Sequence, residues 1–207
     1  MKKLFSYQEL KVIALICMLI DHIGILINNP LCRIIGRLSF PIYAFLLVNG
    51  FFYTRNIRKY GMKLLLFAIL SEIPYDLFLS GSPDFARQNI FFTLYLGLMA
   101  IQLLNKSRKN IPGVIFLLLI AEVLNVDYGF RGILVILAFY FFWNKKVRMT
   151  LALILLLYFS MNGLGSIGAL SIIFICLYDS KKKIKRKCKD FFYIFYPLHL
   201  FILYLVR

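Results

Sequence analysis

Apolar runs fill nearly the whole of this 207-residue chain and are separated by short polar or basic stretches. Runs of this kind predict helices. A helix needs about 20 apolar residues to cross a bilayer, and several runs have only about 12–15, so those would have to tilt or extend through their polar flanks. The pattern predicts about nine transmembrane helices, at 10–27, 38–53, 62–79, 90–104, 111–125, 130–143, 149–160, 166–178 and 191–206.

The composition points to the same class of protein. Hydrophobic residues make up 61% of the chain, and its mean hydropathy is +0.81, whereas soluble domains are roughly half apolar. We therefore expect an all-α, polytopic integral membrane bundle, with residues 1–207 as a single domain. Two lysines precede the first run, but no small-residue cleavage motif follows Ile27, so this run is expected to be retained as a span.

The basic residues are distributed unequally between alternate loops. Twenty of the 25, including every lysine, lie in the N-terminal segment and every second loop, and the other five are arginines. Lysine and arginine mark cytoplasmic loops, so the N-terminus is expected in the cytoplasm of a multi-pass, bacterial-type plasma membrane protein. The net charge of +16 is then explained by topology and membrane lipids, and nucleic acid is not expected as a partner. The five arginines of the outer side are Arg33, Arg37, Arg87, Arg131 and Arg207.

The acidic residues divide the other way. Most of them fall in the outer half of the predicted helices or in the outer loops, where they accompany the arginines. An excess of lysine is explained by membrane topology and lipids alone. A near-balanced set of acids and arginines is not explained in that way and predicts a functional site. The four cysteines are scattered without metal-ligand spacing, so no metal is expected. The outer acids are Asp21, Glu72, Asp76, Asp84, Glu122 and Asp127.

Two histidines and an acid lie deep inside predicted spans. At 1.5 Å per residue, Asp21 and His22 lie about 17 Å from the inner end of the first span, and His199 lies about 12 Å into the last. Titratable groups at this depth are costly and usually functional, although both histidines could instead be neutral packing residues. Adjacent helical side chains point about 100° apart, so Asp21 is expected to pair with Arg33 or Arg37 while His22 serves the site.

Further polar residues lie toward the outer side. Glu72 and Asp76 are spaced i,i+4 on one face of the helix predicted at 62–79, and Tyr196 lies one turn before His199. Two carboxylates at this spacing are compatible either with an arginine-bonded network or with a functional site. Asn89, Asp127 and Tyr128 are equally compatible with ordinary loops. The candidate substrate-binding residues are Arg37, Glu72, Asp76, Asn89, Asp127, Tyr128 and Tyr196.

Several motifs, in order along nearly the full chain, resemble the TraX family. That resemblance implies similarity to transmembrane acyltransferases, which pass acetyl groups from cytoplasmic acetyl-CoA to acceptors across the membrane. The family's namesake is associated with N-terminal acetylation of conjugative pilin. The motifs are the segments Lys11–Gly24, Gly36–Phe45, Ser71–Asp76, Gln88–Leu94, Asp127–Gly129 and Phe195–His199.

The resemblance implies acetyl-CoA as donor and an amine or hydroxyl on a peptide, protein or glycan as acceptor. His22 would be the general base or a transient acetyl carrier, with Asp21 and His199 beside it. Two other functions remain open: a small transporter or proton pathway along the same Asp/His line, and a non-catalytic scaffold. The cytoplasmic residues that could contact the phosphates of the donor are Arg55, Arg58, Lys59, Lys106 and Arg108.

Overall fold

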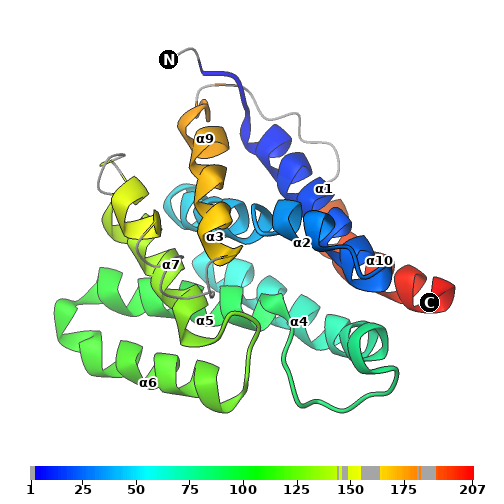
Figure 1. Ribbon diagram of the computed structural model, residues 1–207. Helices are drawn as coiled ribbons and strands as arrows, with labels where there is room; N and C mark the ends of the chain where they lie inside the picture. Colours follow the sequence, from blue (N-terminus) through cyan, green and yellow to red (C-terminus); the bar gives the residue numbers. More distant parts are fainter. Residues whose placement is uncertain (1–2, 144, 146–148, 155–163, 181, 183–189) are drawn as a thin grey trace.

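The computed structural model describes residues 3–143, 145, 149–154, 164–180, 182 and 190–207, and their regular secondary structure is helical (Figure 1). The first half contains α1 (Tyr7–Leu26), α2 (Pro30–Gly36), α3 (Ser39–Tyr53), α4 (Ile57–Ser80) and α5 (Ile90–Lys106). The second half contains η1 (Arg108–Asn110), α6 (Ile111–Val123), α7 (Gly129–Phe141), η2 (Leu164–Leu170), α9 (Ser171–Cys176) and α10 (Phe191–Val206), where η marks a 3₁₀ helix.

Apart from α2, the helices of the first half and α10 follow the predicted apolar runs closely. The run at 166–178 is instead divided into η2 and the short α9. Residues 149–154 are helical, and the rest of the helix predicted at 149–160 lies outside the described residues. So does the basic tract at 181–189, apart from Lys182.

The helix α2 was not predicted, because the sequence interpretation assigned its residues to an outer loop. Its start carries a clear local signal. The side-chain oxygen of Asn29 accepts from the backbone N–H of Leu31 at 2.9 Å, and Pro30 occupies the first helical position. Asn caps helices, and Pro suits the first turn because its missing N–H would have no helical partner there. This short helix brings Arg33 back against α1.

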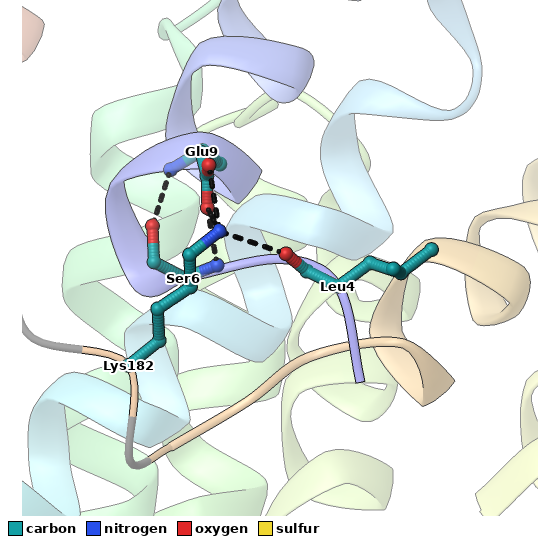
Figure 2. A network of polar contacts seen from close by, with 4 residues as sticks. All are labelled: Leu4, Ser6, Glu9 and Lys182. Carbon is teal, nitrogen blue, oxygen red and sulfur yellow. Dashed lines mark hydrogen bonds and ion pairs between the residues drawn. The ribbon is translucent and has the colours of Figure 1, made fainter. Parts of the chain in front are cut away.

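The start of α1 is fixed by side chains as well as by apolarity (Figure 2). The backbone N–H of Ser6 donates to Glu9 at 2.7 Å, and the Ser6 hydroxyl accepts from the N–H of Glu9 at 3.3 Å. These two bonds form a capping box. The Lys182 ammonium donates to both Glu9 oxygens, at 2.9 and 2.8 Å, and to the Leu4 carbonyl at 2.9 Å. The ammonium lowers the pKa of Glu9 to about 2, and Ser6 adds to the effect.

The bundle is built around α3, which packs against α1, α5, α7 and α9. Most of α3 is buried, with Ile42, Ala44 and Val48 fully inaccessible. On the other side of α1, the C-terminal α10 packs against both α1 and α4 (Figure 1). The first and last helices of the chain therefore lie side by side.

Among the described residues, one helical stretch, Pro30–Tyr53, is both long and apolar enough to cross a bilayer. The apolar helices Ile90–Lys106, Gly129–Phe141, Ile167–Cys176 and Phe191–Val206 are shorter. The helix α1 has 20 residues but carries Glu9, Lys11 and Asp21. The fold is therefore all-helical as predicted, while the nine transmembrane spans stay a prediction.

Segments that the charge pattern assigns to one side of the membrane contact one another. On the lysine-bearing side, Phe5 pairs with Tyr178 through the backbone, and Lys63 forms an ion pair with Asp190. On the arginine-bearing side, Gln88 pairs with Val126. In addition, Arg207 at the end of α10 donates to the Phe78 carbonyl at the end of α4, at 3.0 Å. The bundle thus has a lysine end and an arginine end.

We predict that Gly36→Ala destabilises the protein. A Cβ at this position would overlap the Asp21 side chain, which packs against α2. Overpacking of this kind costs about 1–3 kcal/mol, measurable as a lower midpoint of thermal unfolding in detergent. Gly61→Ala in α4 is the matched control. Its nearest neighbours would lie at 3.7 Å, so it should be neutral or stabilising by up to about 1 kcal/mol. Equal midpoints for Gly36→Ala and the wild type would contradict the close α1–α2 contact.

Glu9→Gln is predicted to remove a pH-dependent part of the stability. Glutamine retains the capping box but not the charge. The pKa of Glu9 falls from 4.5 to about 2 on folding. Its charge therefore stabilises the fold above about pH 4.5, and this contribution is lost as the pH falls toward 2. Unfolding midpoints of the wild type and the variant should differ at pH 7 and converge near pH 2. High salt should reduce the difference, because the carboxylate is exposed. A difference independent of pH would disprove this account.

Candidate functional site

The two histidines of the chain meet where α1, α4 and α10 come together. His22 Nδ1 lies 2.9 Å from His199 Nε2. Phe78 of α4 packs edge-on against the His22 ring, with 5.5 Å between ring centroids, and Tyr196 contacts both histidine rings. His199 is only 4% exposed. The structure brings the histidines together, as their similar predicted depth suggests.

The hydrogen bonds of His199 assign the protons of both rings. Its Nδ1 lies 2.8 Å from the Phe195 carbonyl oxygen, which can only accept, so Nδ1 carries the hydrogen. Burial disfavours a charged imidazole, and a neutral ring with hydrogen on Nδ1 accepts at Nε2. His22 Nδ1 must then donate to His199. The remaining nitrogen, Nε2 of His22, is left with a lone pair that can take a proton or attack a carbonyl.

Asp21 faces away from this pair, toward α2. Its Oδ2 accepts from Arg33 Nη1 at 2.6 Å, which is one of the two pairings expected from the sequence. The other oxygen, Oδ1, is buried without a hydrogen-bond partner among the described residues, and it lies beside Gly36. Asp21 therefore anchors α2 to α1, while its neighbour His22 points to α10.

Glu72, Asp76 and Asn89 hold the loop that connects α4 with α5. Asn89 caps α5 by accepting from the N–H of Phe91 at 3.1 Å, and it donates to Glu72 and to the Ala68 carbonyl. Asp76 Oδ2 accepts from the backbone N–H groups of residues 84 and 85, at 3.3 and 3.2 Å. Within the described ranges, neither acid lies in ion-pair distance of an arginine, so the arginine-bonded network is not formed. A substrate-binding role for these three residues stays a prediction.

A large cavity opens at the lysine end of the bundle and is called the lysine cavity. Its volume is about 660 Å³, and basic side chains and tyrosines line it. A small neighbouring pocket of about 50 Å³, called the narrow extension, shares several of its lining residues and is also lined by Tyr43, Leu64 and Phe91. The lining residues are Tyr7, Gln8, Lys11, Asn49, Gly50, Tyr53, Thr54, Arg55, Asn56, Lys59, Tyr60, Lys63, Tyr178, Ser180, Phe192 and Tyr193.

Two of the five basic residues proposed from the sequence, Arg55 and Lys59, line the lysine cavity, whereas Arg58, Lys106 and Arg108 do not. The sequence interpretation did not assign Lys11 and Lys63 to this site, because their charges were already explained by topology. The spacing of Lys59 and Lys63, i,i+4 on one helix face, was the available signal.

A second, more polar cavity of about 320 Å³ lies at the arginine end and is called the arginine cavity. Three of its residues, Arg37, Asp127 and Tyr128, were proposed from the sequence. Burial raises the pKa of Asp127 to about 6, although the Arg37 guanidinium opposes this shift. Burial also raises the pKa of Tyr128, whose ring stacks on Phe40 with 4.0 Å between centroids. The lining residues are Arg37, Tyr75, Arg87, Glu122, Asn125, Val126, Asp127, Tyr128, Gly129 and Arg131.

Along the helices that carry it, the histidine pair lies beyond the lysine cavity, toward the arginine end of the bundle. In α1, Lys11 of the lysine cavity precedes His22 by about 16 Å, and in α10, Tyr193 precedes His199 by about 9 Å. The narrow extension ends at Phe91, whose ring packs edge-on against Tyr196, with 5.1 Å between centroids. Tyr196 in turn contacts both histidines. Aromatic side chains thus separate the lysine cavity from the histidine pair.

Comparison with known proteins gives a consistent family assignment. A probable fimbrial assembly protein FimC, serogroup H1, of Dichelobacter nodosus is 30% identical, covering 96% of this chain and 94% of its own length. An uncharacterized protein, RP591, of Rickettsia prowazekii (strain Madrid E) is 26% identical over 70% of this chain and 60% of its own length. No solved structure matches significantly. A family model described as TraX protein matches residues 6–207, and the chain therefore belongs to the TraX family.

Proposed function

We propose that this protein transfers an acetyl group from cytoplasmic acetyl-CoA to an amine or hydroxyl acceptor on the outer side of the plasma membrane. One observation carries the proposal: a hydrogen-bonded histidine pair, in which Nε2 of His22 keeps a lone pair, lies deep in a bundle that has a basic cavity at one end and an arginine-rich cavity at the other. A donor and an acceptor that enter from opposite ends could meet at that nitrogen.

The lysine cavity suits the donor. Lys11, Arg55, Lys59 and Lys63 supply positive charge for the phosphates of CoA, and arginine and lysine are the side chains that bind phosphate best. The volume of about 660 Å³ falls within the range of small-molecule sites. The narrow extension lies between this cavity and Phe91. The acetyl-bearing arm of CoA would have to pass Phe91 to reach His22.

His22 would act through Nε2. As the acceptor nitrogen or oxygen bonds to the thioester carbonyl carbon, Nε2 takes the proton that the acceptor loses. The tetrahedral intermediate then collapses, the C–S bond breaks, and the proton passes from His22 to the sulfur, which leaves as the thiol of CoA. The same lone pair would serve if His22 carried the acetyl group transiently. His199 would hold the His22 ring in the tautomer that exposes Nε2.

The acceptor belongs to the outer side in this proposal, because the lysines mark the cytoplasmic side. The name of the Dichelobacter nodosus relative links that protein to fimbrial assembly. A protein of a surface fibre is therefore our first candidate acceptor, ahead of a glycan.

A proton or ion pathway is the second candidate function, because two hydrogen-bonded histidines inside a membrane could also relay protons. It differs from acetyl transfer in one respect that can be measured directly. Proton flux in proteoliposomes would need no acetyl-CoA, and the surface material of the cells would carry no added acetyl group.

His22→Ala is predicted to reduce acetyl transfer by about 10²–10⁴-fold, the usual contribution of a general base. The assay uses inverted membrane vesicles supplied with radiolabelled acetyl-CoA, and it follows label in the vesicle material together with release of CoA. Mass spectrometry of surface material from intact cells should show the matching loss of an acetylated species. Ser171→Ala in α9, which also removes a buried polar group, is the control and should transfer at the wild-type rate. If the His22→Ala protein inserts into the membrane normally and still labels at the wild-type rate, His22 is not the general base.

His199→Gln is predicted to retain more activity than His199→Ala. The glutamine oxygen can still accept the hydrogen bond from His22 Nδ1, and that bond is worth about 1.4 kcal/mol, or about tenfold in rate. The rate constant of transfer should therefore fall in His199→Ala and partly recover in His199→Gln, while the KM for acetyl-CoA stays unchanged in both. Equal rates in the two variants would refute a positioning role for His199 and would show that its side chain contributes only to packing.

A further inference from the structure

The arginine cavity has more positive charge than its own acids neutralise. Arg37, Arg87 and Arg131 face it together with Glu122 and Asp127. Neither Arg37 nor Arg87 forms an ion pair within 4.0 Å of a carboxylate in the described part of the chain. A guanidinium that faces a cavity without such a partner is suited to an anionic ligand.

The two acids are held by the protein itself. Glu122 Oε2 accepts from the backbone N–H of Phe130 at 3.3 Å and lies against Gly129. Gly129 has a φ of +54°, and an added Cβ would lie 2.7 Å from that oxygen. Burial raises the pKa of Asp127 to about 6, and the Arg37 guanidinium opposes this shift. The cavity is lined by three arginines and only two acids, so positive charge is left for a ligand.

The walls of the cavity are tied together before any ligand arrives. Its arginines come from three separate places: the α2–α3 connection, the loop before α5, and α7. The N–H of Asp127 donates to the Gln88 carbonyl at 2.8 Å, and the N–H of Gln88 donates to the Asn125 carbonyl at 3.2 Å. The Asn125 amide also donates to the Ala86 carbonyl at 3.0 Å. The loop that carries Arg87 is thus fixed to the loop that precedes α7, which lowers the entropic cost of binding.

We propose that the arginine cavity binds a carboxylate or phosphate group of the acceptor and so selects an anionic acceptor molecule. This inference rests on the proposed function, because it assigns the cavity to the acceptor side of the same transfer. Asp127 and Glu122, beside the arginines, would accept hydrogen bonds from the amine or hydroxyl groups of that molecule. A neutral glycan would leave the arginines without a partner and would be a poor acceptor.

The test is a calorimetric titration of the purified protein in detergent, without CoA, whose own phosphates would compete with the probes. The probes are inorganic phosphate and succinate, which distinguish a phosphate source from a carboxylate source. Arg87→Gln is the main variant, because Arg87 lies in an exposed loop and its loss should not affect folding. Arg37→Gln is the second variant. Lys109→Gln, which removes an exposed charge from η1, is the control.

We expect at least one probe to bind the wild type and Lys109→Gln equally, and to bind Arg87→Gln and Arg37→Gln about tenfold more weakly. The tighter probe identifies the anionic group. Binding of neither probe to the wild type, or equal binding to all four proteins, would overturn the proposal. The titration involves no acetyl transfer, so its failure is distinguishable from failure of the His22 experiment.

Discussion

The hydrogen bond between His22 and His199 is the contact on which the centre of the molecule depends. It joins the first helix to the last at the place where both pack against α4, and it gives two buried polar rings a partner that the apolar surroundings do not supply. An imidazole without a partner would be costly in such an interior. The Phe195 carbonyl sets the direction of the bond, so that one nitrogen of His22 remains free.

Adjacent residues on α1 perform different tasks because of this geometry. Asp21 turns toward α2 and binds Arg33, while His22 turns toward α10. Gly36 allows α2 to approach closely enough for the first contact. The position of the histidine therefore depends on a short helix that touches the opposite face of α1, and the site is supported from both faces of one helix.

Apolar periodicity and charge asymmetry were sufficient to predict most helices, the two ends of the bundle and the meeting of the histidines. They did not predict α2, because its seven residues are too few for a helical period to stand out from a loop, although Asn29 and Pro30 mark its start. Nor did they predict the cavities. Lys11 and Lys63 already had a topological explanation, and Arg87 and Arg131 meet only because distant loops pair through Gln88 and Val126. Pairings of this kind depend on tertiary contacts that single-sequence patterns do not encode.

The place of His199 near the end of the chain has a consequence for biosynthesis. A chain is made from its N-terminus, so α1 and most of the bundle exist before α10 leaves the ribosome. Until then His22 lacks the partner that orients it, and the inner wall formed by Tyr193 and Tyr196 is missing. A nascent or prematurely terminated protein would thus lack the assembled histidine pair. The last helix completes the histidine pair as well as the fold.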